Sequence, residues 1–299
     1  MNILELLKAN KNILKNGNIE EYDLESELIL MHVLKYSKTE LITNLSKILT
    51  NNQIEKNNKI IIKRLSFLPL PYILRHAYFY NSKFYINKSV LIPRQETELI
   101  VDICANILND SSQETSCKIL EIGTGSGAIT ASLSDKIKSK NFHYIATDID
   151  IKTLKIAKKN ILKINKNIKL DLLNNNLLNG IIGEYKFIIS NPPYLSKNNM
   201  DNLQYELKYE PAKALFAGEK GYEVCEKILK QIKNFNIKFE NLILEINPLN
   251  AKYLMKKTNN LFSNYYSYLI KDYNKKNRFI LISSIKTKNK SSDFSYLPN

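Results

Sequence analysis

A short polar motif, Ser190-Asn191-Pro192-Pro193-Tyr194, follows directly on an apolar run over residues 185–189. Two consecutive prolines cannot continue a strand, because neither has an amide N–H and both have a fixed φ. We therefore expect the chain to leave the carboxyl end of a buried strand as a stiff loop. In open α/β sheets that edge is where ligands bind.

The residue types in this motif suit chemistry at a planar nitrogen. Such a nitrogen is a poor nucleophile, because its lone pair is delocalised. Two fixed acceptors, the Asn191 side-chain oxygen and the Pro192 carbonyl, can hold its two N–H bonds and aim the lone pair at an electrophile. Pro193 stiffens the loop and Tyr194 can pack against the substrate plane. Asn191, Pro192, Pro193 and Tyr194 are the catalytic candidates, acting through positioning and preorganised electrostatics.

A glycine-rich motif, Glu121-Ile122-Gly123-Thr124-Gly125-Ser126-Gly127, follows an earlier predicted strand and opens a predicted helix. Glycines there allow a tight turn and a close approach of the backbone to a ligand. The next predicted strand ends in Asp148, about 20 residues past the glycines, where a carboxylate can accept both ribose hydroxyls of a nucleoside. An ordinary tight turn and a simple helix cap are the structural alternatives for these two features.

The spacing of the glycines distinguishes between cofactors. A nicotinamide dinucleotide places its pyrophosphate at a helix N-terminus and typically uses the longer G-x-G-x-x-G. The motif here is G-x-G-x-G with an acidic residue before it, which suits the cationic sulfonium and ammonium groups of S-adenosylmethionine. The residues of these two features predicted to bind that cofactor are Glu121, Gly123, Thr124, Gly125, Ser126, Gly127 and Asp148.

Short apolar strands alternate with helices from Cys117 onward, which predicts an α/β fold with a parallel sheet covered on both faces. The predicted strands are 118–122, 144–147, 168–173, 186–190, 242–246, 265–270 and 279–283, and the predicted helices are 96–108, 128–137, 154–164, 222–235 and 251–258. The last two strands follow each other without a helix, so we expect an antiparallel pair at one edge.

The first 68 residues have apolar side chains at helical spacing, including one stripe formed by Leu41, Leu45 and Ile48. Pro69-Leu70-Pro71 breaks the pattern, and two β-prone runs around Asn81-Ser82 indicate a hairpin. We therefore expect an N-terminal helical substrate-binding domain over residues 1–70. A β-hairpin linker over 71–94, a catalytic domain over 95–285 and a polar, disordered tail over 286–299 complete the predicted organisation.

Composition narrows the class of protein. Among 299 residues, 44% are hydrophobic and 24% charged, as in ordinary globular proteins, and no apolar run is long enough to span a bilayer. The N-terminus reads as an amphipathic helix, so we expect a cytoplasmic protein without membrane attachment. Three dispersed cysteines and three dispersed histidines indicate reduced thiols and no metal site. The net charge of +15 fits either an anionic partner or a lysine-rich composition without functional meaning.

These motifs together resemble the HemK/PrmC family, the glutamine methyltransferases that modify peptide-chain release factors. The resemblance covers nearly the whole chain and rests on residues 91–98 (LIPRQETE), 121–127, Asp148 and 191–194, with 209–218 and 271–278 in addition. It implies a Rossmann-like methyltransferase sheet, an N-terminal helical domain and a hairpin linker. It also implies that Asn191–Tyr194 hold the glutamine amide of the Gly-Gly-Gln motif of class-I release factors. The resemblance also adds Asn176 and Asn191 as cofactor-binding candidates. Arg94 and Glu210 are added as substrate-binding candidates, although both also fit plain structural roles.

The chain departs from the family pattern at several points. Arg75 and Asn81 stand where the hairpin usually has glycine, Asn247-Pro248 stands where glycine is usual, and no aromatic residue lies near Asn176-Leu177 to stack on an adenine. None of these positions belongs to the predicted methyl-transfer group.

Two other functions are open on the sequence alone. A nucleic-acid methyltransferase acting on an exocyclic amine of adenine or guanine would use the same tetrapeptide, but the helical domain carries no recognisable nucleic-acid module. A non-catalytic partner of the translation apparatus would use the fold only for binding. The expected protein is a monomeric enzyme that requires neither metal nor nucleic acid.

Overall fold

The computed structural model describes residues 1–110, 117–137 and 142–286. It divides the chain into two compact units, of which the first comprises residues 1–76 with 204–209 and the second comprises residues 77–203 with the chain from residue 210 onward. Within the described ranges, no helix combines the length and the apolar character needed to cross a membrane. The predicted tail over 286–299 lies outside the described residues, apart from Lys286.

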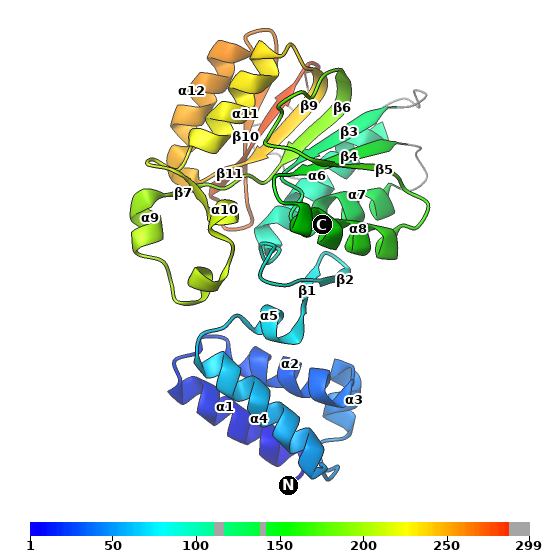
Figure 1. The fold of residues 1–299 in the computed structure, drawn as a ribbon, viewed down its shortest axis with the longest axis vertical. Helices are drawn as coiled ribbons and strands as arrows, with labels where there is room; N and C mark the ends of the chain where they lie inside the picture. The colour runs from blue at the N-terminus through cyan, green and yellow to red at the C-terminus, as the bar shows by residue number, and fades with distance from the viewer. Residues whose placement is uncertain (111–116, 138–141, 287–299) are drawn as a thin grey trace. The chain divides into compact units, whose positions relative to one another are not determined.

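The first unit is helical, as its apolar stripes predict (Figure 1). Its elements are α1 (Ile3–Asn16), α2 (Tyr22–Leu34), α3 (Lys38–Thr43), α4 (Asn51–Leu65), α5 (Leu70–Leu74) and a 3₁₀ turn (Glu206–Tyr209). Three of the helices begin with a capping box, formed by Asn2 with Glu5, Ser37 with Glu40, and Thr50 with Gln53. These reciprocal bonds satisfy amide groups that a helix N-terminus otherwise leaves unpaired.

Two details of the helical unit differ from the sequence pattern. The stripe through Leu45 and Ile48 does not continue α3, because the Asn44 side chain donates to the Glu40 carbonyl (2.8 Å) and closes the helix there. Pro69-Leu70-Pro71 is more than a break, since α5 begins within it. Proline fits the first turn of a helix, where its missing N–H would have no partner in any case.

Buried polar pairs hold this unit together. Asn10 of α1 and Asn57 of α4 exchange two side-chain hydrogen bonds of 2.8 and 2.9 Å. Arg64, 2% exposed, donates from Nε to Glu25 (2.6 Å) and is also ion-paired with Glu206. The segment 204–209 therefore packs inside the helical unit through the Arg64 guanidinium, although the sequence on either side of it belongs to the second unit.

The predicted hairpin is confirmed as β1 (His76–Phe79) and β2 (Ser82–Tyr85). Arg75, where glycine is usual, adopts the left-handed conformation at φ 58°, and in the turn it is Tyr80 (φ 54°) that does so. Phe79 and Phe84 pack edge to face at 6.1 Å between ring centroids, and both are buried in the core of the second unit. The hairpin is therefore anchored to the core of the second unit by its aromatic residues.

A seven-stranded sheet forms the centre of the second unit, with the order β10-β11-β9-β6-β3-β4-β5. The strands are β3 (Lys118–Ile122), β4 (His143–Asp148), β5 (Lys169–Asn174), β6 (Glu184–Ser190), β9 (Lys238–Glu245), β10 (Tyr266–Lys271) and β11 (Asn277–Ser283). β3, β4, β5, β6 and β9 are parallel, whereas β11 is antiparallel to both β9 and β10. The predicted α/β sheet with an antiparallel edge is confirmed.

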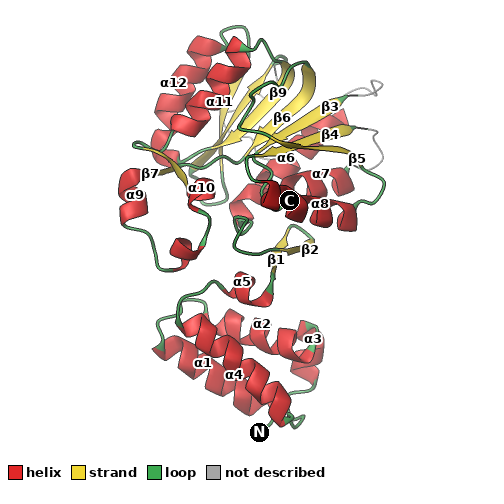
Figure 2. Ribbon diagram, viewed as in Figure 1, coloured by secondary structure: helices red, strands yellow, loops and turns green. Residues whose placement is uncertain are grey.

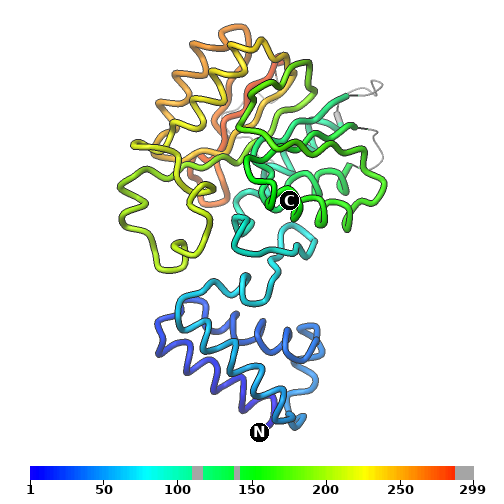
Figure 3. Tube along the Cα trace, in the orientation of Figure 1, coloured from blue at the N-terminus to red at the C-terminus, as the bar shows by residue number. Residues whose placement is uncertain are grey.

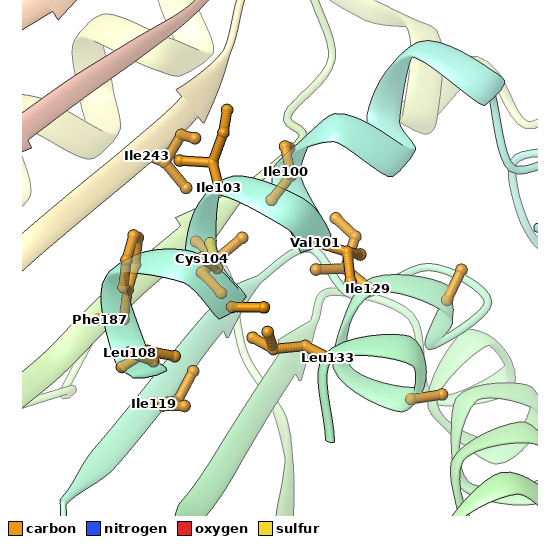
Figure 4. Packing of buried hydrophobic residues seen from close by; sticks show 14 of the residues in the cluster. Ile100, Val101, Ile103, Cys104, Leu108, Ile119, Ile129, Leu133, Phe187 and Ile243 are labelled. Carbon is orange, nitrogen blue, oxygen red and sulfur yellow. The ribbon is translucent and has the colours of Figure 1, made fainter. Parts of the chain in front are cut away.

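Helices cover both faces of the sheet (Figure 2). α6 (Glu98–Asp110), α7 (Ala128–Lys136) and α8 (Ile151–Ile164) lie on one face, and α11 (Glu223–Asn234) and α12 (Ala251–Leu261) on the other. Successive residues of β3 alternate between the two cores, with Ile119 on the α6 side and Leu120 on the α11 side. Figure 4 shows the first core, where Ile103 and Cys104 of α6 pack over Ile119, Phe187 and Ile243 of three strands.

A long excursion of the chain follows β6 and was not predicted in detail from the sequence. It contains β7 (Leu195–Ser196), α9 (Lys197–Asp201), α10 (Ala212–Leu215) and β8 (Phe216–Gly218). The chain returns so that β8 pairs in parallel with β7 (Figure 3). The β7–β8 pair forms a two-stranded sheet of its own, distinct from the hairpin and from the seven-stranded sheet, and it holds the chain just past residues 191–194.

Candidate functional site

A cavity of about 570 Å³ lies in the second unit and takes its lining from the carboxyl ends of the parallel strands. The lining residues Gly123–Ser126 follow β3, and Asp148 ends β4 with Ile149 directly after it. Asn175–Leu177 follow β5, and Asn191 and Pro193 follow β6. A volume of this size is in the range that holds a cofactor or small substrate. The topology therefore brings both predicted motifs to one cavity, as the sheet-edge rule requires.

The first two glycines of the motif face open space. Gly123 (φ 72°) and Gly125 (φ 55°) have left-handed backbones, and a Cβ built on either would meet no atom within 4 Å. The loop is held from outside the cavity, where the Thr124 N–H donates to the Thr147 carbonyl (2.8 Å). A glycine backbone that turns toward unfilled space is what close approach to a ligand requires.

Gly127 has a different environment. It precedes the first residue of α7 at φ 78°, and a Cβ there would lie 2.9 Å from Ile161 Cγ1 and 3.0 Å from Ala157 Cα, both on α8. The residue does not line the cavity. The close packing of α7 on α8 therefore requires a glycine at position 127. Its predicted contact with the cofactor stays a prediction.

Glu121 is buried beneath the glycine loop and reaches the cavity wall. Its carboxylate accepts hydrogen bonds from the hydroxyls of Thr124 (2.8 Å) and Thr130, which tie the loop to α7. Burial raises the pKa of Glu121 to about 7, although both hydroxyls favour the charged form. The acidic residue ahead of the glycines thus shapes the loop, and near neutral pH its carboxyl exchanges between the neutral and the charged form.

Asp148 is half-buried at the end of β4 and aligned by backbone groups. Its two oxygens each accept one hydrogen bond of 3.0 Å from a backbone N–H, one from Gly125 and one from Asp150. Burial is the largest influence on the pKa of Asp148 and raises it. A carboxylate has about four acceptor positions, so two remain for ligand hydroxyls. Asp148 is not the helix cap that the sequence left open as an alternative. The N-cap of α8 is Asp150, whose side chain accepts a hydrogen bond from the Lys152 N–H.

The wall after β5 contains Asn175, Asn176 and Leu177, and Leu177 has a positive φ of 54°. As the sequence shows, none of these is aromatic. Aromatic lining comes instead from Phe79 of β1 and Phe216 of β8.

The tetrapeptide after β6 is fixed at its base. The buried Ser190 hydroxyl donates to the Ile122 carbonyl (2.7 Å), which ties the end of β6 to the start of the glycine loop. Asn191 and Pro193 line the cavity, whereas Pro192 is buried and neither it nor Tyr194 is part of the lining. Burial raises the pKa of Tyr194 to about 12, so its hydroxyl keeps its proton at neutral pH.

Arg94 and Glu210 form an ion pair in which Arg94 lines the cavity and the Glu210 side chain is 2% exposed. Glu210 also accepts the Ile92 N–H (3.0 Å). The pair therefore fastens the returning segment at residue 210 to the turn before α6. Their predicted contact with substrate stays a prediction.

Several residues around the cavity were missed by reasoning from the sequence. Thr97 lines the cavity and accepts a hydrogen bond from Asn191 Nδ2 (3.0 Å). Asn160 of α8 is buried and donates to the carbonyls of Tyr85 and Ser126 (2.8 Å each), which links the hairpin to the glycine loop. An asparagine on the apolar face of helix 151–164 was the available sign of such a role. Among the described residues, no group of histidine, cysteine and acidic side chains could hold a metal ion.

Comparison with known proteins places this site in a family. Residues 5–74 match the model of the PrmC N-terminal domain, and residues 97–246 match that of the methyltransferase small domain. The release factor glutamine methyltransferase of Dictyoglomus turgidum is 32% identical over 269 residues, which cover 89% of this chain and 91% of that protein. The chain belongs to the release factor glutamine methyltransferase family. The resemblance stated from the motifs is therefore confirmed.

Other relatives match this chain over different lengths. The release factor glutamine methyltransferase of Mycoplasma mycoides subsp. mycoides SC is 37% identical over 242 residues. The match covers 77% of this chain and 83% of that protein. A bifunctional methyltransferase from Rickettsia prowazekii is 34% identical over 94% of this chain. This chain spans 57% of that relative's length, and about half of the related Rickettsia proteins.

Proposed function

We propose that this protein transfers a methyl group from S-adenosylmethionine to the side-chain amide nitrogen of the Gly-Gly-Gln glutamine in class-I peptide-chain release factors. The observation that carries the proposal is the single cavity lined by Gly123, Asp148 and Asn191 at the ends of three adjacent parallel strands. A nucleoside-type cofactor and an amide substrate would meet in that cavity.

The residues present fit the cofactor. Gly123 and Gly125 border open space, Asp148 keeps acceptor positions for ribose hydroxyls, and Ile149 and Leu177 offer apolar surface beside it. Asp148, together with Glu121 in its ionised form, makes this end of the cavity acidic, which suits a cation better than a pyrophosphate. When bound, S-adenosylmethionine would supply a methyl group activated by its positive sulfonium.

The protein's own contribution at the substrate nitrogen is positioning. The Asn191 side-chain oxygen would accept one amide N–H, and Pro193 would restrict where the substrate can lie. Acceptance of the second N–H by the carbonyl of Pro192, which is not part of the lining, stays a prediction. The nitrogen becomes acidic once it is alkylated, so water can take its proton and no strong base is needed. Orientation and fixed dipoles of this kind are worth orders of magnitude in rate.

We also propose that the helical domain over residues 1–70 binds the release factor, and that the enzyme works as a cytoplasmic monomer without metal or nucleic acid. The match of residues 5–74 to a family-specific N-terminal domain supports the first part. Release factors act in translation, which supports the cytoplasmic location.

Mass spectrometry of a release factor isolated without its modification tests the proposal. The factor is incubated with this protein and S-adenosylmethionine, digested, and its Gly-Gly-Gln peptide is examined. We expect one added methyl group on the glutamine side chain, and none on a matched factor whose glutamine is replaced by asparagine.

The same preparation is offered total RNA and DNA with a labelled methyl donor. Label in nucleic acid, with none in the release factor, would favour methylation of an exocyclic amine. Cofactor binding without transfer to any of these substrates would contradict both functions.

A further inference from the structure

Three polar side chains from separate parts of the second unit form a hydrogen-bonded chain that ends at the tetrapeptide. Asn191 Nδ2 donates to Thr97 Oγ1 (3.0 Å), and Thr97 Oγ1 donates to Glu245 Oε2 (2.8 Å). Asn191 follows β6, Thr97 lies in the 3₁₀ turn before α6, and Glu245 ends β9. Thr97 and Glu245 are 4% and 1% exposed, so water does not readily substitute for either bond.

We propose that Thr97 and Glu245 are positioning residues that determine which end of the Asn191 side-chain amide faces the substrate. This inference rests on the proposed function, because it concerns the residue that would orient the reacting nitrogen. It adds two residues that the motif itself does not contain.

The direction of the chain follows from counting protons. When Glu245 is ionised, its carboxylate only accepts hydrogen bonds, so the single hydroxyl proton of Thr97 is then committed to Glu245. The Thr97 oxygen then offers only lone pairs to Asn191, which must present its NH₂ end. The carbonyl oxygen of the same planar amide points away from Thr97 and is available as the acceptor that a substrate N–H needs.

The reversed amide is disfavoured in this arrangement. It would place the Asn191 oxygen against the Thr97 lone pairs and would offer N–H donors to a substrate that itself donates. Preorganisation in a buried site requires that the wrong orientation have no partner, and here the carboxylate removes that partner.

The environment of Glu245 makes the chain sensitive to pH. Burial raises the pKa of Glu245 to about 7, whereas Thr97, Arg278 and Arg94 lower it. The ionisable groups that act on Glu245 or lie against it are Glu96 and Arg94 near α6, Tyr194 after β6, Cys225 of α11, and Arg278 of β11, itself paired with Asp272. When Glu245 binds a proton, it can donate to Thr97, and the directional constraint on Asn191 is lost.

Thr97→Val and Thr97→Ser form the test pair. Valine keeps the shape and removes the hydroxyl, whereas serine keeps the hydroxyl. With release factor as substrate, we expect Thr97→Val to lower kcat by about tenfold or more, less than direct loss of a preorganised group. The KM for S-adenosylmethionine should change by less than about twofold. The reason is that Thr97 acts through the Asn191 side-chain amide, whose proposed partner is the substrate nitrogen and not the cofactor's ribose. Thr97→Ser should recover most of kcat.

Glu245→Gln tests the negative charge of Glu245 separately from the hydrogen bond that it accepts from Thr97. Glutamine still offers an acceptor oxygen but cannot gain a proton near neutral pH. We expect kcat of this variant to fall less on acidification below about pH 7 than kcat of the wild type. The proposal would be overturned in favour of a packing role by either of two results. One is a pH profile of kcat in Glu245→Gln that equals that of the wild type, and the other is an equal loss of kcat in Thr97→Val and Thr97→Ser.

A readout without substrate keeps this test separate from the proposed function. The Asn191 side-chain amide resonances are assigned in a ¹H–¹⁵N spectrum by their loss in Asn191→Ala. We expect a proton on Nδ2 to be protected from exchange in the wild type and in Thr97→Ser, and unprotected in Thr97→Val. Equal exchange in all three proteins would overturn the chain itself, whatever the substrate proves to be.

Discussion

Alanine substitution distinguishes the two kinds of glycine in the motif over residues 121–127. At Gly127 the new Cβ would lie 2.9–3.1 Å from Ile161 and from the Ala157 backbone of α8, at a left-handed φ of 78°. At Gly123 the φ of 72° is similar, but no atom lies within 4 Å. The two alanine variants therefore share the backbone strain of a positive φ, and only Gly127→Ala adds a steric clash with α8.

The expected magnitudes follow from these surroundings. A left-handed conformation costs a non-glycine residue about 1–2 kcal/mol. Overpacking a core with an extra carbon typically adds about 1–3 kcal/mol. Gly127→Ala should therefore lower the free energy of unfolding by about 2–5 kcal/mol, against about 1–2 kcal/mol for Gly123→Ala.

Cofactor affinity should show the opposite order. The Cβ of Gly123→Ala enters the cavity beside the predicted cofactor, and a clash of about 1–3 kcal/mol there weakens binding roughly tenfold to hundredfold. Gly127 does not line the cavity, so Gly127→Ala should bind S-adenosylmethionine with nearly wild-type affinity as long as it is folded.

Both quantities are measurable on the cofactor-free protein. Thermal unfolding is followed by circular dichroism, because the chain has no tryptophan, and cofactor affinity is measured by titration calorimetry below the unfolding range. If Gly127→Ala kept its stability and lost cofactor binding, the packing role would be refuted and Gly127 would be a direct cofactor contact.

Two further predictions concern the carboxylates of the cavity. Asp148→Ala should raise the KM for S-adenosylmethionine and leave kcat at saturating cofactor within a few-fold, because we propose that its free acceptor positions bind the ribose and not the reacting nitrogen. Steady-state methylation assays measure both constants, and a loss confined to kcat would contradict this assignment. Glu121→Gln should weaken the pH dependence of stability. The folded-state pKa of Glu121 is raised to about 7 from 4.5, so folding is favoured by its proton below about pH 4.5 and loses that contribution as the pH rises through about 7. The contribution is about 3 kcal/mol at most, and unfolding free energies of wild type and variant across this range test it. Parallel curves for the two proteins would show that Glu121 does not titrate there.

Much of the fold was accessible from the sequence because it depends on local pattern. Buried parallel strands read as short apolar runs, and β3 was predicted with its observed bounds, 118–122. The antiparallel edge followed from the missing helix between β10 and β11. The cavity-lining glycines and Asp148 were found for the same reason, since each directly follows a recognisable strand.

The supporting residues were not accessible, because their roles depend on contacts across the chain. Thr97 and Glu245 are 148 positions apart and meet only when α6 and β9 are in place. The threonine stood inside the motif over residues 91–98, but nothing local distinguished it from its charged neighbours. Glu245 ends an apolar strand, and an acidic residue at that position was the sign that a polar partner had to be buried with it.

The most direct test of the account is the turnover of Asn191→Ala on a release factor, with cofactor affinity measured on the same preparation. The clamp predicts a fall in kcat of about a hundredfold or more, the scale for removal of one preorganised polar group, with the Kd for S-adenosylmethionine changed by less than about threefold. Near-normal kcat in the folded variant would contradict the assignment of Asn191 as the residue that orients the glutamine amide.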